Sequence, residues 1–187
     1  MIKSKHSGKI KRELHTSNSF FLNLCKVIRN VTLNDAKAIT EIYNYYIKNS
    51  VATLEEQTVT ESYFKDEIIK VTQEFPWFVY EVDGEIIGFA NASSWKARSG
   101  YRKSAQLMVY LHPEKVSKGV GTLLYSAVID VLKEKDIHVI MGGISLPNEA
   151  SIKLHEKFGF EKVAHYKEIG YKFNKWVDVG YWQLTLK

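Results

Sequence analysis

One segment, residues 109–125, constrains the possible folds of this chain more than any other. An apolar run with strand character, Val109–Leu111, stops before Pro113, and a short polar loop then carries Gly119 and Gly121 into a strongly helical stretch. A strand, a glycine-containing turn and a helix N-terminus in this order expose backbone N–H groups at the positive end of a helix dipole, where phosphate binds well. The spacing matches neither a Walker A loop nor G-x-G-x-x-G, so an ordinary connecting turn is the alternative.

The rest of the body predicts strands and helices with no internal repeat and no linker. Helices are expected after a cap at Asn34 or Asp35, from Thr60, after Gly121, and from Pro147 to Gly159. Strands are expected at residues 27–31, 77–82, 85–92, about 104–111, 138–144, about 162–169 and 177–185. The order β-α-α-β-β-β-α-β-α-β-β predicts an α/β fold, with a mixed sheet of about seven strands and helices on both faces.

Apolar spacing also predicts which helix faces turn inward. In the first helix the recurring residues are Ala38, Ile42, Tyr45 and Tyr46. In the helix after Gly121 they form one broad stripe made of Leu123, Leu124, Ala127, Val128, Val131 and Leu132. Both helices are therefore expected to pack on the sheet.

The charge of the chain is unevenly distributed, which bears on its partners. The formal net charge at pH 7 is +5, yet residues 1–26 hold six basic residues and one acidic residue, so the remainder is neutral. We therefore expect a flexible basic extension over 1–26, one folded domain over 27–187, and a partner that is neither nucleic acid nor membrane. The single cysteine, Cys25, excludes an internal disulfide framework and favours a reducing, cytoplasmic compartment.

Several short motifs occur in a fixed order along the neutral body. They are Val109–Leu111, Gly119–Gly121, Leu146-Pro147-Asn148, Leu154–Phe160, Gly170–Lys172 and Trp176–Gln183. On these motifs, about residues 26–187 resemble the GNAT superfamily of acyl-CoA-dependent N-acetyltransferases, and within it the phosphinothricin N-acetyltransferase branch. The resemblance implies a GNAT fold, acetyl-CoA as co-substrate, a small-molecule amine as acceptor, no metal, and a homodimer.

The resemblance also implies where acetyl-CoA binds. Its pyrophosphate is expected on the loop Lys118–Thr122, and its pantetheine arm in a gap between the strand ending near Leu111 and the strand starting near His138. The implied cofactor-binding residues are Val109, Tyr110, Leu111, Lys118, Gly119, Val120, Gly121, Thr122, Asn148 and Ser151.

Some of these residues have a second interpretation. Lys115 and Lys118 either add positive charge near the phosphates or lie in a solvated loop. Asn148 contacts the pantetheine arm, caps the following helix, or does both. Val116 stands where the family usually has Gln or Arg, three residues before the first glycine, so weaker cofactor binding is expected.

Acetyl transfer needs a neutral amine, a hydrogen-bond donor for the developing oxyanion, and a proton for the departing thiolate. The resemblance assigns the last role to His155, one helical turn after Ser151. The branch normally supplies a glutamate base where this chain has Gln106, and a carboxamide accepts no proton at neutral pH. Glu55 and Glu56, in the loop after the first helix, are candidate substitutes or solvated loop acids.

The acceptor side departs from the branch in one further way. An arginine that commonly follows a tryptophan and holds the substrate carboxylate is replaced here, in Trp95-Lys96, by lysine, which keeps the charge but lacks the bidentate fork. Arg98 and Arg102 are close enough in sequence to compensate. The implied substrate-binding residues are Trp95, Lys96, Arg98 and Glu55, and the aromatic residues expected in the acceptor pocket or in the core are Tyr43, Trp95, Tyr101, Tyr171 and Trp176.

The sequence therefore predicts an acetyl-CoA-dependent N-acetyltransferase for the amine of a small amino acid or analogue, such as phosphinothricin or methionine sulfoximine. A first alternative is acetylation of another amine, such as a polyamine or a protein N-terminus, which predicts acidic walls around the acceptor. A second alternative is a GNAT-fold module that binds acyl-CoA without turnover, suggested by Gln106 and Val116.

Overall fold

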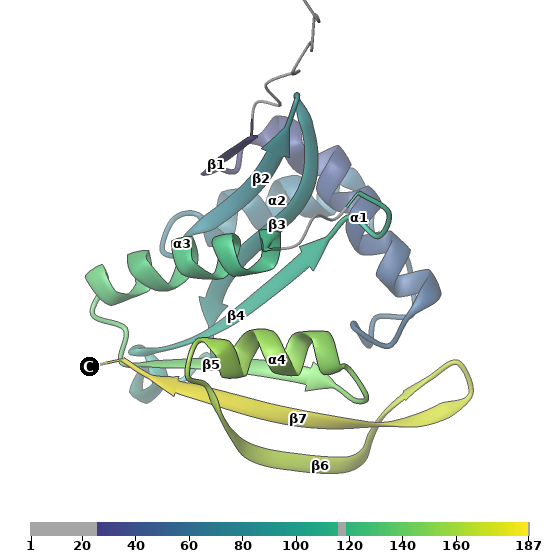
Figure 1. The fold of residues 1–187 in the computed structure, drawn as a ribbon, viewed down its shortest axis with the longest axis vertical. Coiled ribbons are helices and arrows are strands. Elements are labelled where there is room, and N and C mark those ends of the chain that lie inside the picture. Colours follow the sequence, from purple (N-terminus) through teal and green to yellow (C-terminus); the bar gives the residue numbers. More distant parts are fainter. Residues whose placement is uncertain (1–25, 116–118, 187) are drawn as a thin grey trace, which may run out of the picture.

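A computed structural model describes residues 26–115 and 119–186. They form a mixed seven-stranded sheet of strand order β1-β2-β3-β4-β5-β7-β6, with helices on both faces (Figure 1). The predicted fold class and element order are confirmed. The predicted extension, residues 1–26, lies outside the described residues except for Lys26, which begins the first strand. Among the described residues, no helix is both long enough and apolar enough to cross a membrane.

The elements follow the predicted boundaries closely. The strands are β1 (Lys26–Asn30), β2 (Trp77–Val82), β3 (Glu85–Ser94), β4 (Ser104–Leu111), β5 (Val139–Ser145), β6 (Glu161–Lys172) and β7 (Lys175–Thr185). The helices are α1 (Ala36–Asn49), α2 (Glu61–Val71), α3 (Val120–Glu134) and α4 (Glu149–Lys157). β3 and β6 run past their predicted ends, because strand pairing with β4 and β7 continues to Ser94 and Lys172.

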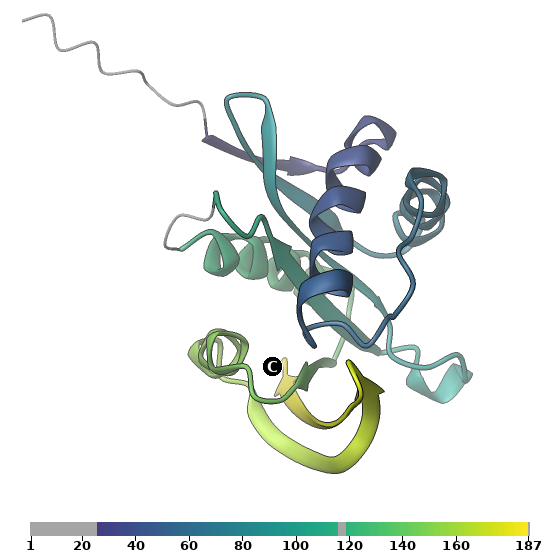
Figure 2. The same cartoon turned by 90° about the vertical axis from the view of Figure 1, so that its right-hand side faces the viewer.

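The sheet separates two apolar clusters. Helices α3 and α4 cover one face and helices α1 and α2 cover the other (Figure 2). Side chains of β4 alternate between the faces, as expected for a strand. Leu107 packs in the cluster under α3, whereas Tyr110 packs against the cluster under α1 and α2. The direction of each β4 side chain thus fixes the face on which it acts.

The predicted inward faces of α1 and α3 are confirmed at Ile42, Leu124, Val128 and Leu132, which are buried, and wrong at one residue of each helix. Tyr45 of α1 and Leu123 of α3 are 42% and 49% exposed, whereas Ile39 and Tyr125 are buried. Apolar residues cover most of the first turns of α3, so periodicity alone does not decide which of them meets the sheet. The contact between α3 and the sheet places Tyr125 in the interior and leaves Leu123 at the surface.

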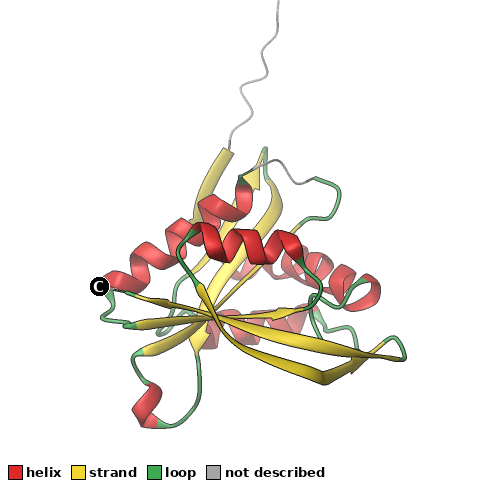
Figure 3. Cartoon of the chain, turned by 60° about the horizontal axis from the view of Figure 1, so that its bottom comes forward, coloured by secondary structure: helices red, strands yellow, loops and turns green. Residues whose placement is uncertain are grey.

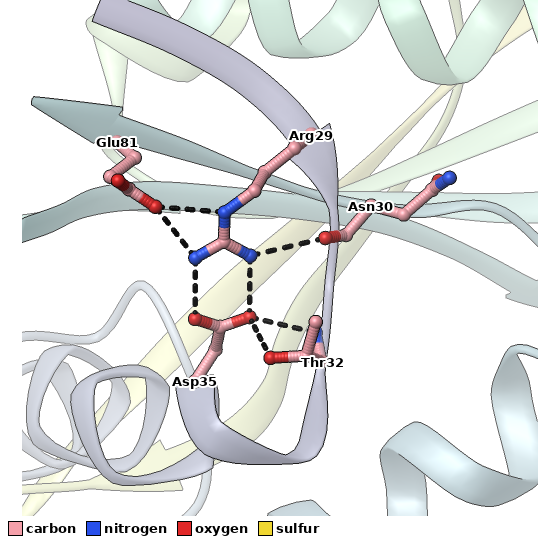
Figure 4. Close-up of polar contacts among 5 residues, drawn as sticks. All are labelled: Arg29, Asn30, Thr32, Asp35 and Glu81. Carbon is pink, nitrogen blue, oxygen red and sulfur yellow. Dashed lines mark hydrogen bonds and ion pairs between the residues drawn. The ribbon is translucent and has the colours of Figure 1, made fainter. Parts of the chain in front are cut away.

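An ion-pair network fastens the start of α1 to the sheet (Figure 4). Arg29 of β1 donates to both carboxylate oxygens of Asp35 at 2.8 Å, and its Nε donates to Glu81 of β2 at 2.8 Å. Asp35 also accepts from the backbone N–H of Thr32 at 2.7 Å, so its carboxylate closes the short 3-10 turn Leu33–Asp35 and does not cap α1 as the sequence suggested. Burial alone would raise the pKa of Asp35, but the hydrogen bonds from Arg29 and Thr32 outweigh it and hold that pKa below its usual value.

Replacing Asp35 with alanine is expected to lower the free energy of unfolding by about 2–4 kcal/mol, because it leaves Arg29 half-buried without its main partner. Since the folded-state pKa of Asp35 is lowered, its contribution is full above the unfolded-state pKa and is lost as pH falls through the folded-state pKa. Urea denaturation at pH 7 and near pH 3 measures both effects. Asp66→Ala, an exposed carboxylate on α2, is the control, and an equal loss in both variants would contradict the role of Asp35.

Candidate active site

A gap opens in the sheet between β4 and β5. The two strands are parallel but pair only from Ser104 to Gln106, opposite Val139 to Met141. Beyond that point β4 remains paired with β3 as far as Leu111, and β5 remains paired with β7 as far as Ser145. Each strand therefore presents an edge without a β partner to the gap, as the sequence resemblance implied.

This gap widens into a cleft of about 1020 Å³. It is lined by β4 and β5, by α4 and Tyr125 of α3 on one face of the sheet, and by α1 residues and Trp95 on the other. The β6–β7 hairpin, which extends past α4, adds Tyr166 and Ile169 (Figure 3). Among the described lining residues Lys96 is the one lysine or arginine, and none is aspartate or glutamate. The cleft thus passes from one face of the sheet to the other and is lined by both polar and apolar groups.

The N-terminus of α3 lies at one end of this cleft. Gly119 is its N-cap residue, with a left-handed φ of 97° that favours glycine, and it supplies no capping side chain. The first turn carries no acidic residue either, so within the described part of the chain no side chain caps its N–H groups, and the positive end of the helix dipole suits an anion. Lys118 lies outside the described residues, and Gly119, Val120, Gly121 and Thr122 adjoin the cleft without lining its wall.

Gly121 has a packing role beside the one that its motif suggests. It is buried, and a Cβ there would lie 3.3 Å from Leu154 of α4 and 3.6 Å from Leu111 of β4. Both leucines line the cleft. The small residue therefore allows α3 to pack closely at the end of the gap, in addition to any approach of the backbone to a phosphate.

The structure places two lysines near this end of the cleft, and Lys115 follows the solvated-loop alternative. Lys115 forms an exposed ion pair with Glu85, with 2.7 Å between Nζ and Oε2. Lys157 of α4 donates to the hydroxyl of Thr122 at 3.3 Å, which places a cation beside the first turn of α3. Sequence reasoning missed Lys157, although it lies within the motif Leu154–Phe160.

His155 is buried, at 3% exposed, and both its ring nitrogens have partners. Nδ1 lies 2.7 Å from the carbonyl oxygen of Ser151, and because a carbonyl only accepts, Nδ1 carries the proton. Nε2 then accepts from the hydroxyl of Tyr125 at 3.0 Å. Burial lowers the pKa of His155, although the hydrogen bond to Ser151 acts the other way, so the ring is neutral at pH 7.

Tyr125 and Gly142 complete the surroundings of this imidazole, and sequence reasoning missed both. A Cβ at Gly142 of β5 would overlap the ring of His155, so only glycine leaves room for it there. Tyr125 is 1% exposed, and burial raises its pKa. A tyrosine one turn after Gly121, on an otherwise aliphatic helix face, is the signal that could have identified it.

Gln106 reaches the same cleft from the opposite face of the sheet. Its neighbours Ala105 and Leu107 belong to the cluster under α3, so its own side chain points to the α1 and α2 side. Glu55 and Glu56 are exposed and do not line the cleft. The described part of the cleft therefore contains no carboxylate to replace the missing glutamate.

The face that Gln106 occupies also holds the predicted substrate residues Trp95 and Lys96. Trp95 packs edge-to-face on Tyr181 at 5.3 Å between ring centroids, and Nζ of Lys96 lies 5.3 Å from the centre of the Trp95 ring. Arg98 is exposed and does not line the cleft. Of the other aromatic candidates, Tyr43 lines the cleft, while Tyr101, Tyr171 and Trp176 do not.

Asn148 and Ser151 line the cleft at the start of α4. The side-chain oxygen of Asn148 accepts from the backbone N–H of Ser151 at 3.1 Å, which is the capping interpretation. Asn148 therefore caps α4 and lies in the cleft wall, where its side chain also has the position to contact a ligand. Within the described residues, no group of three or more His, Cys, Asp or Glu side chains is placed to hold a metal.

This geometry is similar to that of known proteins. Residues 28–180 match the family model described as Acetyltransferase (GNAT) domain. A phosphinothricin N-acetyltransferase of Streptomyces coelicolor is 32% identical over 156 residues, which cover 81% of this chain and 91% of that protein. An L-methionine sulfoximine/L-methionine sulfone acetyltransferase of Salmonella typhimurium is 34% identical over 160 residues, covering 85% and 94%. The solved structure of the Salmonella typhimurium acetyltransferase yncA with its cofactor acetyl-CoA has a TM-score of 0.84 at 33% identity, covering 87% of this chain and 94% of that chain.

Proposed function

Because the chain belongs to the GNAT family of acetyltransferases and is an N-acetyltransferase, we propose that it transfers acetyl from acetyl-CoA to the α-amine of a small amino acid or amino-acid analogue. One observation carries the proposal. A single cleft runs from beside the N-terminus of α3 to an acceptor region that holds one cation and, among the described residues, no carboxylate.

The cleft fits acetyl-CoA by its chemistry. The free N–H groups at the start of α3, with Lys157 beside them, suit a pyrophosphate. The unpaired edge of β4, residues 107–111, suits the amide groups of a pantetheine arm, since these need backbone partners. Asn148 and Ser151 lie along the same path. A relative of known structure is described with acetyl-CoA as its cofactor, which supports this assignment.

The reaction forms one N–C bond, breaks one C–S bond, and moves one proton from nitrogen to sulfur. We assign the transfer of that proton to His155, which lines the cleft and whose Nε2 is the unprotonated ring nitrogen. A lowered pKa keeps the ring in the neutral form that can accept a proton and then release it. Gln106 orients the amine or a water molecule from the opposite face, and the acceptor reacts in its neutral form because the described cleft offers no carboxylate base.

The charge of the cleft favours an amino acid over other amines. A polyamine or another cationic acceptor would require acidic walls, and none of the described lining residues is acidic. Lys96 suits one carboxylate, and Trp95 and Tyr43 suit an uncharged side chain. The relatives act on phosphinothricin and on methionine sulfoximine or methionine sulfone, as their names state. The non-catalytic alternative is not favoured, because these relatives are enzymes.

An acceptor screen with acetyl-CoA, read as free thiol, tests this proposal. We expect release with L-methionine sulfone and L-methionine sulfoximine and none with spermidine. Phosphinothricin carries a second anionic group but meets one cleft cation, so its kcat/KM is expected to be at least about tenfold lower than that of methionine sulfone. Thiol release that is fastest with spermidine, or absent with every amino acid while calorimetry shows acetyl-CoA binding, would overturn the acceptor assignment.

Two further features belong to the proposal. A homodimer is supported by large exposed apolar side chains along the β6–β7 hairpin. They are Val163, Tyr166, Ile169, Tyr171, Phe173 and Trp176. Sedimentation equilibrium tests the homodimer, because it measures the mass of the particle in solution.

A cytoplasmic location is supported by the single cysteine and is checked by fractionation of the source cells. The proposed mechanism uses no metal ion, so we expect EDTA to leave the rate of acetyl transfer unchanged.

A further inference from the structure

Lys172, near the end of β6, is buried at 1% exposed with its ammonium group surrounded by backbone carbonyls. Nζ donates to the carbonyl oxygens of Thr53 at 2.7 Å, Ser50 at 2.8 Å and Tyr46 at 3.5 Å. An ammonium has three donors, and these three carbonyls use them all. Buried lysines are rare because the charge loses its water, so this one has a specific reason to be there.

The reason lies partly in the end of α1. The last carbonyls of a helix have no partner within it and carry the negative end of its dipole. Tyr46 belongs to the last turn of α1 and Ser50 is its C-cap residue, so the ammonium closes the helix and turns the chain toward Thr53. Burial lowers the pKa of Lys172, while the nearby Glu55 and Glu56 oppose the change.

The loop held by Lys172 forms part of the wall of the cleft. Ala52 and Leu54 both line it. The Thr53 hydroxyl lies 2.9 Å from that of Tyr43, and the hydroxyl of Tyr110 donates to the carbonyl oxygen of Ala52 at 3.4 Å. These side chains lie on the α1 and α2 face of the sheet, where Gln106 also points.

Lys172 itself belongs to the β6–β7 hairpin, which forms the cleft wall opposite the loop at residues 50–54. Gly170, two residues earlier in β6, packs so closely on Leu54 that a Cβ there would lie 2.7 Å from Cδ1 of the leucine. Tyr166 and Ile169 of the same strand line the cleft. The hydrogen bonds of Lys172 therefore set the separation between the loop at residues 50–54 and the β6 strand.

We propose that Lys172 is a positioning residue for the acceptor: its buried ammonium holds the two walls of the acceptor region at the spacing the amino acid requires. The proposal rests on the proposed acetyl-transfer function. Lys172 touches neither substrate, and it lies on the face away from α3 and α4, where acetyl-CoA is assigned. Replacing Lys172 should therefore raise the KM for the acceptor and leave the KM for acetyl-CoA nearly unchanged.

Lys172→Met removes the charge and keeps the length of the side chain. We expect the KM for the acceptor to rise at least about tenfold, with the KM for acetyl-CoA changed by less than about twofold. Gly170→Ala moves Leu54 without altering the lysine, and it should also raise the KM for the acceptor. This second variant tests the spacing of the two walls if Lys172→Met does not fold. Lys175→Met, an exposed lysine on the same hairpin, is the control and should leave both KM values unchanged.

Amide hydrogen exchange separates a failure of this proposal from a failure of the proposed function. In Lys172→Met, exchange should rise at residues 50–56 and stay unchanged in β3 and β4, whether or not the correct acceptor is known. Unchanged exchange in that loop, or an unchanged acceptor KM in a folded variant, would overturn the role of Lys172. If the wild-type protein acetylates no amino acid but the exchange result holds, the acceptor assignment is wrong and the positioning of the loop stands.

Discussion

Replacing Gln106 with glutamate is expected to raise kcat/KM for the acceptor by about ten- to hundredfold at pH 7, since a positioned general base contributes about 10²–10⁴ in favourable cases. The carboxamide of Gln106 accepts no proton, and the described lining of the cleft offers no carboxylate in its place. A glutamate at this position would project to the acceptor side from β4, where the amine is assigned. The substitution needs little rearrangement, because glutamine and glutamate have nearly the same shape.

The dependence of kcat/KM on pH shows whether a glutamate at position 106 acts as a general base or only adds a negative charge. In the wild-type protein kcat/KM should climb with pH until the amine of the acceptor is neutral, because no residue is assigned to deprotonate its ammonium form. His155 is assigned the later proton, which passes from nitrogen to sulfur after the amine has attacked. In Gln106→Glu the rise should level off above the pKa of the new carboxyl group. Gln57→Glu makes the same chemical change in an exposed loop and is the control. No gain over that control, with the same pH profile as the wild type, would mean that proton removal proceeds by a route independent of residue 106.

The sequence predicted the fold well because the signals were local. The turn at Asp83 and Gly84, the helix stop at Gly159 and the apolar run before Ile144 each depend on a few adjacent residues. The gap between β4 and β5 was expected only from the family resemblance, since strand separation leaves no mark in composition or periodicity. Helix orientation was harder, and Tyr45 and Leu123 face solvent because tertiary contact chose among equally apolar neighbours.

The site was predicted less completely, for a physical reason. His155 and Gln106 were found by position, but their environment depends on residues distant in the sequence. Tyr125 meets His155 only because α3 and α4 cover the same face, and Lys172 meets Ser50 only because β6 approaches the end of α1. Such contacts between elements have no signature in a single sequence.

Replacing His155 is expected to lower kcat by about 100-fold, in line with the loss of a general acid–base group. His155→Gln keeps polar atoms near the positions of the ring nitrogens but cannot take up and release a proton, so it isolates the chemical role better than His155→Ala. The KM for acetyl-CoA should change by less than about twofold, because the assigned phosphate and pantetheine contacts come from other residues. His138→Ala, an exposed histidine at the start of β5, is the control. An unchanged kcat in His155→Gln would remove this residue from the mechanism.

Tyr125→Phe tests whether the hydrogen bond to Nε2 controls the charge of the imidazole. The Tyr125 hydroxyl donates to Nε2 only while that nitrogen is unprotonated, so we expect this hydrogen bond to favour the neutral ring, in addition to the burial that lowers the pKa of His155. Removing the hydroxyl should therefore raise that pKa, and the acid limb of the kcat profile should move to higher pH. The effect on kcat above that limb should be small, because Nε2 remains free to carry the proton from nitrogen to sulfur. An acid limb that stays in place, with equal losses of kcat at every pH, would show that the tyrosine acts on packing alone. A shift of the limb to lower pH would contradict the expected effect of the hydroxyl on the pKa of His155.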